Sequence, residues 1–546
     1  MPAFAPSTRL ATHEVSNQPA PLAGRNLHLT DLAMREAVLR EAGPWLDGRA
    51  AALGEVIGSE EVLQLGEDAN RHPPELKTFD RYGRRLDEVV FHPSYHRLMA
   101  LAMEHGIHDL PWRADEPGAH CAHAALLALF TQAEAGVLCP VDMTYASVAA
   151  LRGDAQVGAA WADRIIGGRY DAALRPAPEK AGITVGMAMT EKQGGSDVRA
   201  NATRAEPLGG VDYELTGHKW FCSAPMSDAF LTLAQAPGGL TCLVVPRITP
   251  QGERNAVHLQ RLKDKLGNRS NASSEIEYAG ALAHRLGEEG QGVKVIIDMV
   301  HHTRLGTVAG TLGIMRRALV EAVNHAEGRT AFQKKLIDQP AMTAVLADLA
   351  LEYEAAVVLV MRVARAFSEP DDASRAFARL AVALAKYRLT KRCPEFVYEC
   401  MEAHGGVGYV EETPMPRLFR ESPLNAIWEG SGNVIALDVL RTLRREPTAL
   451  DAFRAEIADA VPSQPRLARA AAELEPLATG GEAQARLLAE RMALVLQGAL
   501  LVKHAPAAVA DGFCASRLSR EGGAAYGALP AGADIAAVLA RQRTAA

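Results

Sequence analysis

Hydrophobic residues in the first third of the chain recur at helical spacing. From about residue 30 to residue 168, apolar positions follow one another at intervals of three and four, as in the series Leu32, Ala33, Ala37, Val38 and Ala42. Residues 122–133 are rich in Ala and Leu, which favour helices. The pattern predicts an N-terminal helical domain over residues 1–180.

From residue 181 the pattern changes to short β-prone runs. These runs are residues 183–189, 213–215, 230–233 and 240–245, and turns containing Gly-Gly, Pro or Asp separate them. Short strands joined by tight turns are typical of an antiparallel sheet. We therefore expect a small antiparallel β domain over residues 181–286.

Long helical patterns return after residue 286. They cover residues 293–327, 340–367, 373–403 and 433–445, and predict a helical bundle over residues 287–445. Residues 446–546 are again rich in Ala and Leu, with breaks at Gly480-Gly481, Gly522-Gly523 and Pro530, and predict a C-terminal helical domain. The expected fold class is therefore mainly α with a central antiparallel β domain.

Composition limits the classes of protein that fit the chain. A length of 546 residues with 48% hydrophobic and 23% charged residues is typical of a large globular protein with several domains. The formal net charge of −7 argues against a uniformly basic nucleic-acid-binding protein, so any anion-binding surface must be local. Seven cysteines without a C-x-x-C pair indicate reduced thiols, for which the cytoplasm is the expected compartment.

Neither a membrane nor a metal is an expected partner. The longest apolar-looking tract, residues 341–367, contains five charged residues that a bilayer does not tolerate without partners. Residues 1–20 lack the basic start and apolar core of a signal peptide. The sequence has no paired His or Cys ligand spacing and no dinucleotide-binding, Walker or nucleophile-elbow motif, which disfavours zinc, Rossmann, P-loop and hydrolase interpretations.

The most informative segment is residues 427–433, Ile-Trp-Glu-Gly-Ser-Gly-Asn. It places one carboxylate, Glu429, between a large aromatic ring and a turn of small residues. Burial beside an aromatic ring raises the pKa of a carboxyl group, which suits a general base. The alternative is a helix N-terminus, with Glu429 in the first turn and Ser431 as its cap. Other segments must decide between these interpretations.

Two segments of the β region could contact a planar ligand. Residues 187–197 follow a β run and end in a Gly-Gly-Ser-Asp turn, whose backbone N–H groups and hydroxyls suit a phosphate or a hydrogen-bonding ring. The alternative is an ordinary β-turn. Residues 217–223 place Trp220 and Phe221 just before Ser223. A ring beside a hydroxyl suits a flavin, although aromatic residues in strands usually belong to the core.

Two further segments lie between predicted helices. Residues 328–333 carry Arg329 and Phe332, which could grip a pyrophosphate, including one bound mainly by a neighbouring subunit. A surface arginine is more commonly only solvated. Residues 404–409 contain three glycines that let a backbone approach a ligand closely, although a Gly-rich turn after a helix is more often a C-cap.

In their order along the chain, these four segments and Glu429 resemble the acyl-CoA dehydrogenase family, over roughly residues 180–445. The resemblance implies FAD between the β domain and the helices that follow it, with its adenosine end reaching a neighbouring subunit. Hydrogen bonds to the flavin are implied for Thr190 and Ser223. The residues implied to flank the flavin are Met187, Ala188, Met189, Thr190, Gly194, Gly195, Ser196, Phe221, Cys222 and Ser223. Those implied to reach the adenine and pyrophosphate are Arg329, Phe332, Gly405, Gly406, Val407 and Gly408. Further FAD contacts are implied for Ile427, Trp428, Gly430, Ser431, Gly432 and Asn433.

Glu429 falls on the position of the family's catalytic base. The α-proton of a thioester is weakly acidic, so a desolvated carboxylate must remove it while the flavin takes a hydride from the β-carbon. Some relatives carry the base on an earlier helix, where this chain has Thr303. Glu429 is therefore the better candidate.

Departures from the common pattern point to one branch of the family. Lys192 and Gln193 follow Glu191 where most relatives have Pro, and Ser431-Gly432-Asn433 follows the Glu-Gly pair. With the long N-terminal region and about a hundred residues after Arg445, these features resemble the AidB subgroup of alkylation-response flavoproteins. This resemblance implies double-stranded DNA binding through the C-terminal region, weak dehydrogenation of a short or branched acyl-CoA, and a homotetramer made of two dimers.

The charge distribution gives weak independent support for DNA contact. Residues 441–546 carry 13 Lys and Arg against 11 Asp and Glu, a net charge of +2, whereas residues 1–440 carry −9. A mildly positive tail has the right sign for phosphate contact. Arg441, Arg444 and Arg445 share a predicted helix end and are the candidate DNA-binding residues, although cations there also offset the helix dipole.

Three hypotheses remain open from the sequence. The preferred one is an AidB-like FAD flavoprotein that binds DNA and acts in the response to alkylation damage. The second is an ordinary catabolic acyl-CoA dehydrogenase with an enlarged C-terminus and no DNA role. The third is a flavin-containing protein that shields DNA without physiological catalysis.

Overall fold

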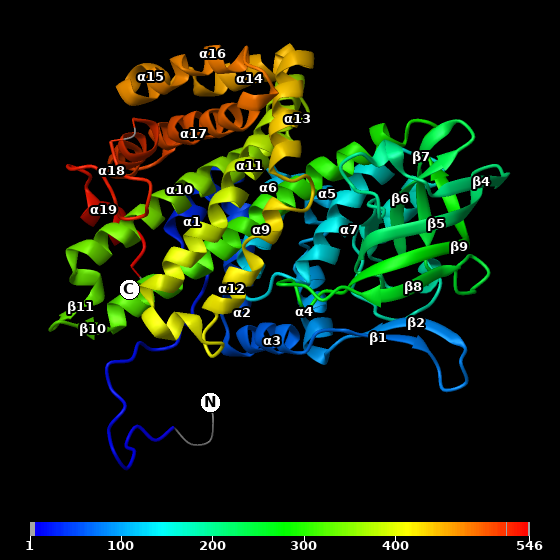
Figure 1. The fold of residues 1–546 in the computed structure, drawn as a ribbon, viewed down its shortest axis with the longest axis horizontal. Helices are drawn as coiled ribbons and strands as arrows, with labels where there is room; N and C mark the ends of the chain where they lie inside the picture. Colours follow the sequence, from blue (N-terminus) through cyan, green and yellow to red (C-terminus); the bar gives the residue numbers. More distant parts are fainter. Residues whose placement is uncertain (1–5, 520, 544–546) are drawn as a thin grey trace.

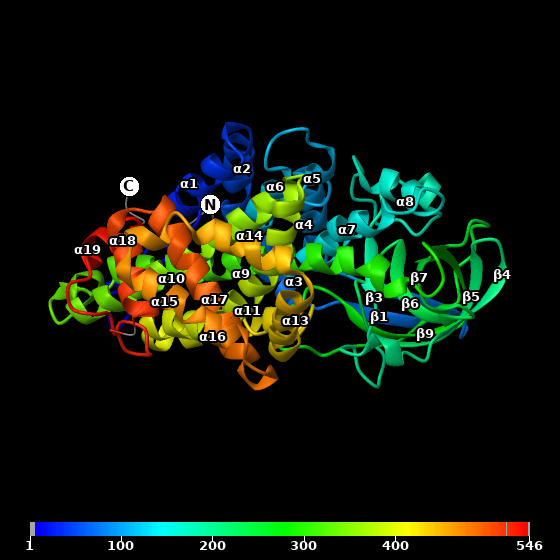
Figure 2. The ribbon, with the colours of Figure 1, turned by 90° about the horizontal axis from the view of Figure 1, so that it is seen from above.

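The computed structural model describes residues 6–519 and 521–543 of the chain. The first five residues of the predicted N-terminal domain, and Arg520 and the last three residues of the predicted C-terminal domain, lie outside this range. The β domain lies at one end of an elongated molecule, long helices cross the middle, and the C-terminal helices stack over the other end (Figures 1 and 2). The molecule is mainly helical around one β domain, as the sequence predicts.

The N-terminal region is built from eight helices. They are α1 (Leu32–Glu41), α2 (Pro44–Ile57), α3 (Glu60–Arg71), α4 (Pro93–Glu104), α5 (Leu110–Arg113), α6 (Ala119–Thr131), α7 (Leu138–Leu151) and α8 (Gly158–Ile165). Every residue of α6 is buried, and α7 is buried except at Asp142 and Ala149. Both helices pack against α9, so they form the inner layer of this region.

A β-hairpin interrupts this helical region, which the hydrophobic pattern does not predict. Strands β1 (Glu75–Phe79) and β2 (Arg85–Val90) pair antiparallel. The hairpin is held from outside, since Arg85 Nη2 donates 2.9 Å to the carbonyl of Leu259 and Asp87 Oδ1 accepts 3.0 Å from the N–H of Leu259. An isolated hairpin is marginally stable at best, so these tertiary contacts explain its presence.

Seven strands form the β domain. They are β3 (Val185–Ala188), β4 (Arg204–Gly209), β5 (Asp212–Ser223), β6 (Ala229–Ala236), β7 (Gly239–Pro246), β8 (Val257–Leu262) and β9 (Ser273–Leu286). Six of them follow the order β3-β6-β4-β5-β9-β7, and β8 pairs with β9 beside this path. The strands close on themselves because β7 also pairs with β6. The pairings are antiparallel, as expected, except for β3–β6 and β4–β6, which are parallel. The sheet is therefore mixed.

Three long helices form the central bundle. They are α9 (Gly292–Gly328), α10 (Pro340–Ser368) and α11 (Asp372–Ala403). The short strands β10 (Thr330–Ala331) and β11 (Lys334–Lys335) form a hairpin after α9, and the turn η4 (Gly405–Tyr409), α12 (Met415–Glu421), the turn η5 (Leu424–Ala426) and α13 (Gly432–Arg445) follow α11. The helix α9 also contacts β7, which joins the bundle to the β domain.

The C-terminal extension folds back onto the bundle. It contains α14 (Pro447–Ile457), α15 (Pro465–Ala472), α16 (Leu474–Ala478), α17 (Ala485–His504), α18 (Ala507–Phe513), a π-helical turn η8 (Cys514–Leu518) and α19 (Ile535–Ala540). The helix α17 packs against α10, α11 and α13. Within the described residues, no helix is long and apolar enough to cross a bilayer.

Candidate active site

Glu429 lies in a bent loop just before α13. Its backbone has φ of 57°, a left-handed conformation that is uncommon for a residue other than glycine, and Gly430 follows with φ of 104°. The helix begins only at Gly432, and the side chain of its N-cap, Ser431, makes no capping hydrogen bond. Glu429 is therefore outside the first helical turn, and the alternative of an ordinary helix start does not describe it. Strained backbone of this kind gathers at functional sites.

Side chains from two helices hold this loop in place. Thr303 Oγ1 on α9 donates 2.8 Å to Glu429 Oε2, and Arg304 Nε reaches the carbonyl of Glu429 at 3.3 Å. From α11, Lys386 Nζ donates 2.7 Å to the carbonyl of Gly430. Arg304 is fixed in turn by Asp438 of α13, at 2.8 Å. The carboxylate is thus oriented by a hydroxyl, and its backbone by two cations.

The surroundings favour the protonated form of Glu429. Burial raises the pKa of its carboxyl above the ordinary value, and the charge of Asp142 raises this pKa further. The Thr303 hydrogen bond and the positive charges of Lys386 and Arg304 oppose the rise in pKa. A carboxyl group whose pKa is raised in this way suits proton transfer near neutral pH.

Asp142 on α7 is a second carboxylate beside Glu429. Its Oδ1 lies 3.0 Å from His123 Nε2, and the other ring nitrogen of His123 lies 2.8 Å from the carbonyl of Ile107. Burial raises the pKa of Asp142, and His123 lowers it in part. Asp142 is seated against α9, since a Cβ at Gly306 would lie 1.8 Å from Asp142 Oδ1. Two carboxylates with raised pKa values therefore share one desolvated site.

A buried wall of rings surrounds His123. The His123 ring stacks on Tyr145 with centroids 3.5 Å apart, and the Tyr145 hydroxyl lies 2.7 Å from His120 Nδ1. Trp112 and His302 complete the wall, with ring centroids 5.2 Å apart. Burial lowers the pKa of His302 to about 4, so its ring is neutral at physiological pH.

The loop that carries Thr190 is held by a buried carboxylate. Glu191 is fully buried, accepts 2.9 Å from Lys219 Nζ, and accepts hydrogen bonds from Thr203. Burial alone would raise the pKa of Glu191, but hydrogen bonds from Thr203 and the Ala202 N–H outweigh it and bring the pKa to about 2. The Thr190 carbonyl accepts 2.7 Å from the Trp220 N–H, which fixes this loop to β5.

The residues predicted around the flavin do not all expose their side chains. Met187 and Met189 are half-buried, and the turn at Gly194, Gly195 and Ser196 is exposed. Phe221 is 47% exposed, and Ser223 Oγ lies 3.2 Å from Ser273 Oγ. The side chains of Ala188 and Cys222, in contrast, are fully buried in the core. At these two positions alternate strand residues point inward, so any contact with the flavin would come from their backbone.

Segments 187–189 and 427–430 both border one apolar cluster at the domain boundary. The ring of Trp428 packs against the same apolar cluster as Met187 and Met189, and its Nε1 donates 2.9 Å to Asn425 Oδ1. Ile427 beside it is 65% exposed. Gly432 is half-buried and Asn433 exposed at the start of α13. The β domain and the Glu429 loop thus form one site.

The residues predicted at the adenosine end lie elsewhere in the chain. Arg329 and Phe332 belong to the β10–β11 hairpin, at the opposite end of the molecule from the β domain (Figure 1). The turn from Gly405 to Gly408, in which Gly405, Gly406 and Val407 are exposed and Gly408 is buried, begins next to His404. The ring of His404 lies 4.8 Å from that of His325 near the end of α9. One chain therefore does not bring these residues to Glu429, and their role at a neighbouring subunit's FAD stays a prediction.

The candidate DNA-binding arginines lie on one helix end, as predicted. Arg441, Arg444 and Arg445 of α13 are all exposed. Among the described residues, Arg444 donates 3.2 Å to the carbonyl of Gly480, and no ion pair is found for any of the three. Their charges are therefore not neutralised by a neighbouring carboxylate of the described chain.

Comparison with known proteins places the chain in a family. Residues 17–172 match the model for the adaptive response protein AidB N-terminal domain, residues 186–281 the acyl-CoA dehydrogenase middle domain, and residues 290–444 the acyl-CoA dehydrogenase C-terminal domain. The chain is 44% identical over 519 residues to the putative acyl-CoA dehydrogenase AidB of Escherichia coli (strain K12), covering 94% of this chain and 95% of that relative. The chain belongs to the acyl-CoA dehydrogenase family. Within it, the chain is of the AidB type.

Solved acyl-CoA dehydrogenase structures agree with this family. Caenorhabditis elegans acyl-CoA dehydrogenase family member 11 is 30% identical over 490 residues, covering 82% of this chain and 78% of that relative. The crystal structure of Caenorhabditis elegans ACDH-11 in complex with C11-CoA superimposes with a TM-score of 0.83 at 26% identity, covering 94% of both chains. The apo form of Bd2924 gives 0.82 at 27% identity, covering 90% of this chain and 100% of the other.

As an acyl-CoA dehydrogenase, the chain is an FAD-dependent oxidoreductase. The described residues fit a flavin, because Phe221 and Ile427 present large apolar surfaces beside the hydroxyls of Thr190 and Ser223. Thr190 and Ser223 would hydrogen-bond the flavin ring, which would supply the hydride acceptor. A flat apolar ring with polar edges is covered well by such a site.

No sequence motif identifies four of the residues in the site. Asp142, His123, Arg304 and Lys386 come from α7, α6, α9 and α11, and each lies in an unremarkable helical pattern. The sequence offers only one hint, a charged residue inside a buried helical stretch. Lys386 and Arg304 fit this description, but so do the charged residues of several structural ion pairs. Only the packing of these helices identifies them.

Proposed function

We propose that this AidB-type acyl-CoA dehydrogenase binds double-stranded DNA and takes part in protection from, or response to, DNA alkylation damage, with weak dehydrogenation of a short or branched acyl-CoA. The observation that carries the DNA part is the exposed, unneutralised group of Arg441, Arg444 and Arg445 on α13. Similarity to AidB along nearly the whole chain supports the cellular role.

For the dehydrogenation, Glu429 takes the α-proton of the thioester onto its carboxylate. Thr303 holds that carboxylate at 2.8 Å, and Lys386 and Arg304 anchor the loop by its carbonyl groups. The bound FAD supplies the acceptor for the β-hydride. The buried wall around His123 excludes water, which keeps Glu429 a strong enough base in the substrate complex.

A short acyl group suits this site better than a long one. Asp142 places a second carboxyl group beside Glu429, and an apolar acyl chain packed against these buried groups offers them no hydrogen-bond partner. The solved complex of ACDH-11 contains C11-CoA, a longer acyl chain. We infer that Asp142 is one reason for weak activity toward ordinary substrates.

Anaerobic bleaching of the flavin tests the enzymatic part. Isobutyryl-CoA added to the FAD-loaded protein should reduce the yellow flavin, and Glu429→Gln should slow this reduction by a factor of about a hundred or more, the usual contribution of a general base. Glu475→Gln, an exposed change of the same kind on α16, is the matched control. Bleaching at the parent rate in Glu429→Gln would place the base elsewhere.

Salt-dependent duplex binding tests the DNA part. The parent should bind a generic duplex at low salt, and the triple variant Arg441→Gln, Arg444→Gln, Arg445→Gln should lower the slope of log affinity against log salt by about 0.9 for each phosphate that the protein no longer neutralises. A control that removes three exposed cations from the β1–β2 hairpin, Lys77→Gln, Arg81→Gln, Arg84→Gln, changes net charge equally. Equal losses of affinity in both variants would contradict a specific contact at α13.

These experiments also separate the alternatives. A protein that bleaches readily but does not bind duplex DNA at low salt is an ordinary catabolic acyl-CoA dehydrogenase. One that binds DNA but is not bleached by any acyl-CoA of a panel is a DNA-shielding flavoprotein without physiological catalysis.

We propose a homotetramer of paired dimers in the cytoplasm. Phe332 is 92% exposed and Tyr409 is 82% exposed near the two Gly-containing segments predicted to reach a neighbour's FAD, which supports burial between subunits. All seven cysteines lie within the described residues as buried free thiols, which supports a reducing compartment. Sedimentation equilibrium of the FAD-loaded protein tests the tetramer.

A further inference from the structure

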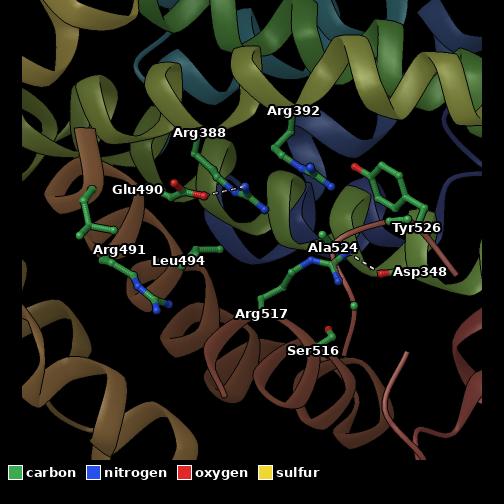
Figure 3. A pocket seen from close by; sticks show the side chains of 13 residues that line it. Asp348, Arg388, Arg392, Glu490, Arg491, Leu494, Ser516, Arg517, Ala524 and Tyr526 are labelled. Carbon is green, nitrogen blue, oxygen red and sulfur yellow. Dashed lines mark hydrogen bonds and ion pairs between the residues drawn. The ribbon is translucent and has the colours of Figure 1, made fainter. Parts of the chain in front are cut away.

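A polar cavity lies where the C-terminal extension meets the central bundle. Its volume is about 260 Å³, and side chains of α10, α11, α17, η8 and the loop at residues 523–526 line it. It lies apart from the Glu429 loop, on the side of α11 that faces α17 (Figures 1 and 3). Neither the dehydrogenase site nor the proposed DNA contacts at α13 use its residues.

Four arginines from three elements line this cavity. Arg388 and Arg392 belong to α11, Arg491 comes from α17, and Arg517 comes from η8 (Figure 3). Tyr526 closes one side, with its ring 4.7 Å from the Arg392 guanidinium. Four guanidinium groups around one small space repel one another unless negative charge lies between them.

The protein supplies part of that negative charge. Glu352 accepts 2.7 Å from Arg388 and 3.1 Å from Arg517, and Asp348 accepts 2.5 Å from Arg517. Glu490 lies 3.7 Å from Arg388. These three carboxylates therefore serve mainly two of the four arginines, Arg388 and Arg517.

Arg491 has no such partner. Its side chain is buried, with 9% exposure for the residue, and within the described residues neither an ion pair nor a hydrogen bond is found for it. Arg392 pairs with Glu395, which is exposed and does not line the cavity, and its Nε lies 3.9 Å from Glu352. In addition, Nε of Arg388 and Nε of Arg392 are buried without a hydrogen-bond partner. Buried guanidinium groups with unused donors are costly in a folded protein unless an acceptor fills the gap.

We propose that this cavity binds a phosphate group, either as inorganic phosphate or as the terminal phosphate of a small or nucleic-acid phosphomonoester. A tetrahedral phosphate offers several acceptor oxygens to donors arriving from different sides, and arginine recognises such groups well. Its negative charge balances Arg491. The volume of about 260 Å³ accommodates a phosphate with a small substituent or with ordered water.

The site would join the extension to the bundle. Arg388 and Arg392 belong to the bundle, whereas Arg491 and Arg517 belong to the extension. A bound phosphate bridges both sets of donors, so it stabilises the docking of the extension by mass action. Phosphate occupancy is therefore expected to raise the unfolding temperature of the full-length protein.

Calorimetric titration of the FAD-saturated protein with inorganic phosphate, at constant ionic strength against chloride, tests the proposal. We expect saturable binding at one site per chain and an increase in unfolding temperature that chloride does not reproduce. Arg491→Gln should weaken the affinity about ten- to a hundredfold, as for the loss of a charge-assisted hydrogen bond. Arg469→Gln, an exposed change on α15, should leave it unchanged.

A second variant and a second ligand keep the test decisive. Arg491→Lys keeps the charge and should retain most of the affinity, even if Arg491→Gln folds poorly. A 5′-phosphorylated oligonucleotide that competes with inorganic phosphate, while its 5′-hydroxyl counterpart does not, identifies a nucleic-acid end as the source, and no competition identifies free phosphate. Absence of phosphate-specific binding in the parent, or equal affinity in Arg491→Gln, would overturn the proposal.

Discussion

Thr303 Oγ1 donates a 2.8 Å hydrogen bond to Oε2 of Glu429, which lies 126 residues later in the chain. Thr303 lies at the position on α9 where some relatives carry the catalytic base. In this chain it supplies a hydroxyl to Glu429, the candidate base on the other segment. The hydrogen bond stabilises the ionised form of Glu429, whereas burial and the charge of Asp142 stabilise the protonated form. The pKa of Glu429 is the outcome of these opposed effects.

Removal of the Thr303 hydroxyl should shift the pH dependence upward. In Thr303→Val, Glu429 loses a hydrogen bond to its carboxylate, so its pKa rises and the acidic limb of the rate of flavin bleaching moves up by about one pH unit, equivalent to roughly 1.4 kcal/mol. Thr303→Ser keeps the hydroxyl and should retain the parent profile. An unshifted limb in Thr303→Val would show that this hydrogen bond does not tune the base.

Neutralisation of Asp142 should shift the acidic limb of the flavin-bleaching rate to lower pH. Asp142→Asn removes the negative charge that raises the pKa of Glu429, so the acidic limb should move to lower pH by up to about one unit. The amide can still hydrogen-bond Nε2 of His123, so the fold of α7 is retained. Asp163→Asn on the exposed face of α8 is the control. A shift to higher pH would contradict the assignment of Asp142 as a neighbour that raises this pKa.

A methyl group on α9 should disturb Asp142 directly. In Gly306→Ala the new Cβ lies 1.8 Å from Asp142 Oδ1, so Asp142 or the helix must move, at a cost of about 1–3 kcal/mol in the free energy of unfolding. Gly310→Ala, one turn along the same helix, meets its nearest atom at 3.6 Å and should be neutral or stabilising, since alanine favours helices. Urea denaturation of both variants measures the difference.

The ion pair behind the Glu429 loop should govern stability at acidic pH. Burial alone would raise the pKa of Asp438, but the Arg379 hydrogen bond and the charge of Arg304 lower it to about 2, below its value in the unfolded chain. A lowered pKa means that Asp438 stabilises the fold above about pH 4, and that this contribution is lost as pH falls from about 4 to about 2. Asp438→Asn should therefore lower the free energy of unfolding by about 3 kcal/mol at pH 7, since it leaves Arg304 without an ion pair and Arg379 with only the 3.7 Å contact to Glu446.

Denaturant unfolding at several pH values checks this expectation. The difference between the parent and Asp438→Asn should narrow as the pH falls from about 4 to about 2. Over this range Asp438 takes up its proton first in the unfolded chain and then, near pH 2, in the folded protein. Asp451→Asn, on the exposed side of α14, serves as the control. A difference that stays constant with pH would assign the loss to packing instead of charge.

Much of the fold was predictable from hydrophobic spacing. The long helices α9, α10 and α11 and the β-prone runs of the central domain have strong periodic patterns because one face or both faces of each element are buried. The β1–β2 hairpin was not predictable in this way, since its strands are short and only partly buried, and contacts from Leu259 hold it. The parallel pairing of β3 with β6 depends on which strands meet in space, which local spacing does not encode.

By itself, the sequence determined the helix–sheet–helix order, the family motifs and the candidate base Glu429, because these depend on residue types at short spacing. The tertiary structure decided how that base is tuned. Thr303, Asp142, Lys386 and Arg304 come from three helices and meet only when those helices pack. Electrostatic effects depend on distance in space and on burial, and neither follows from distance along the chain.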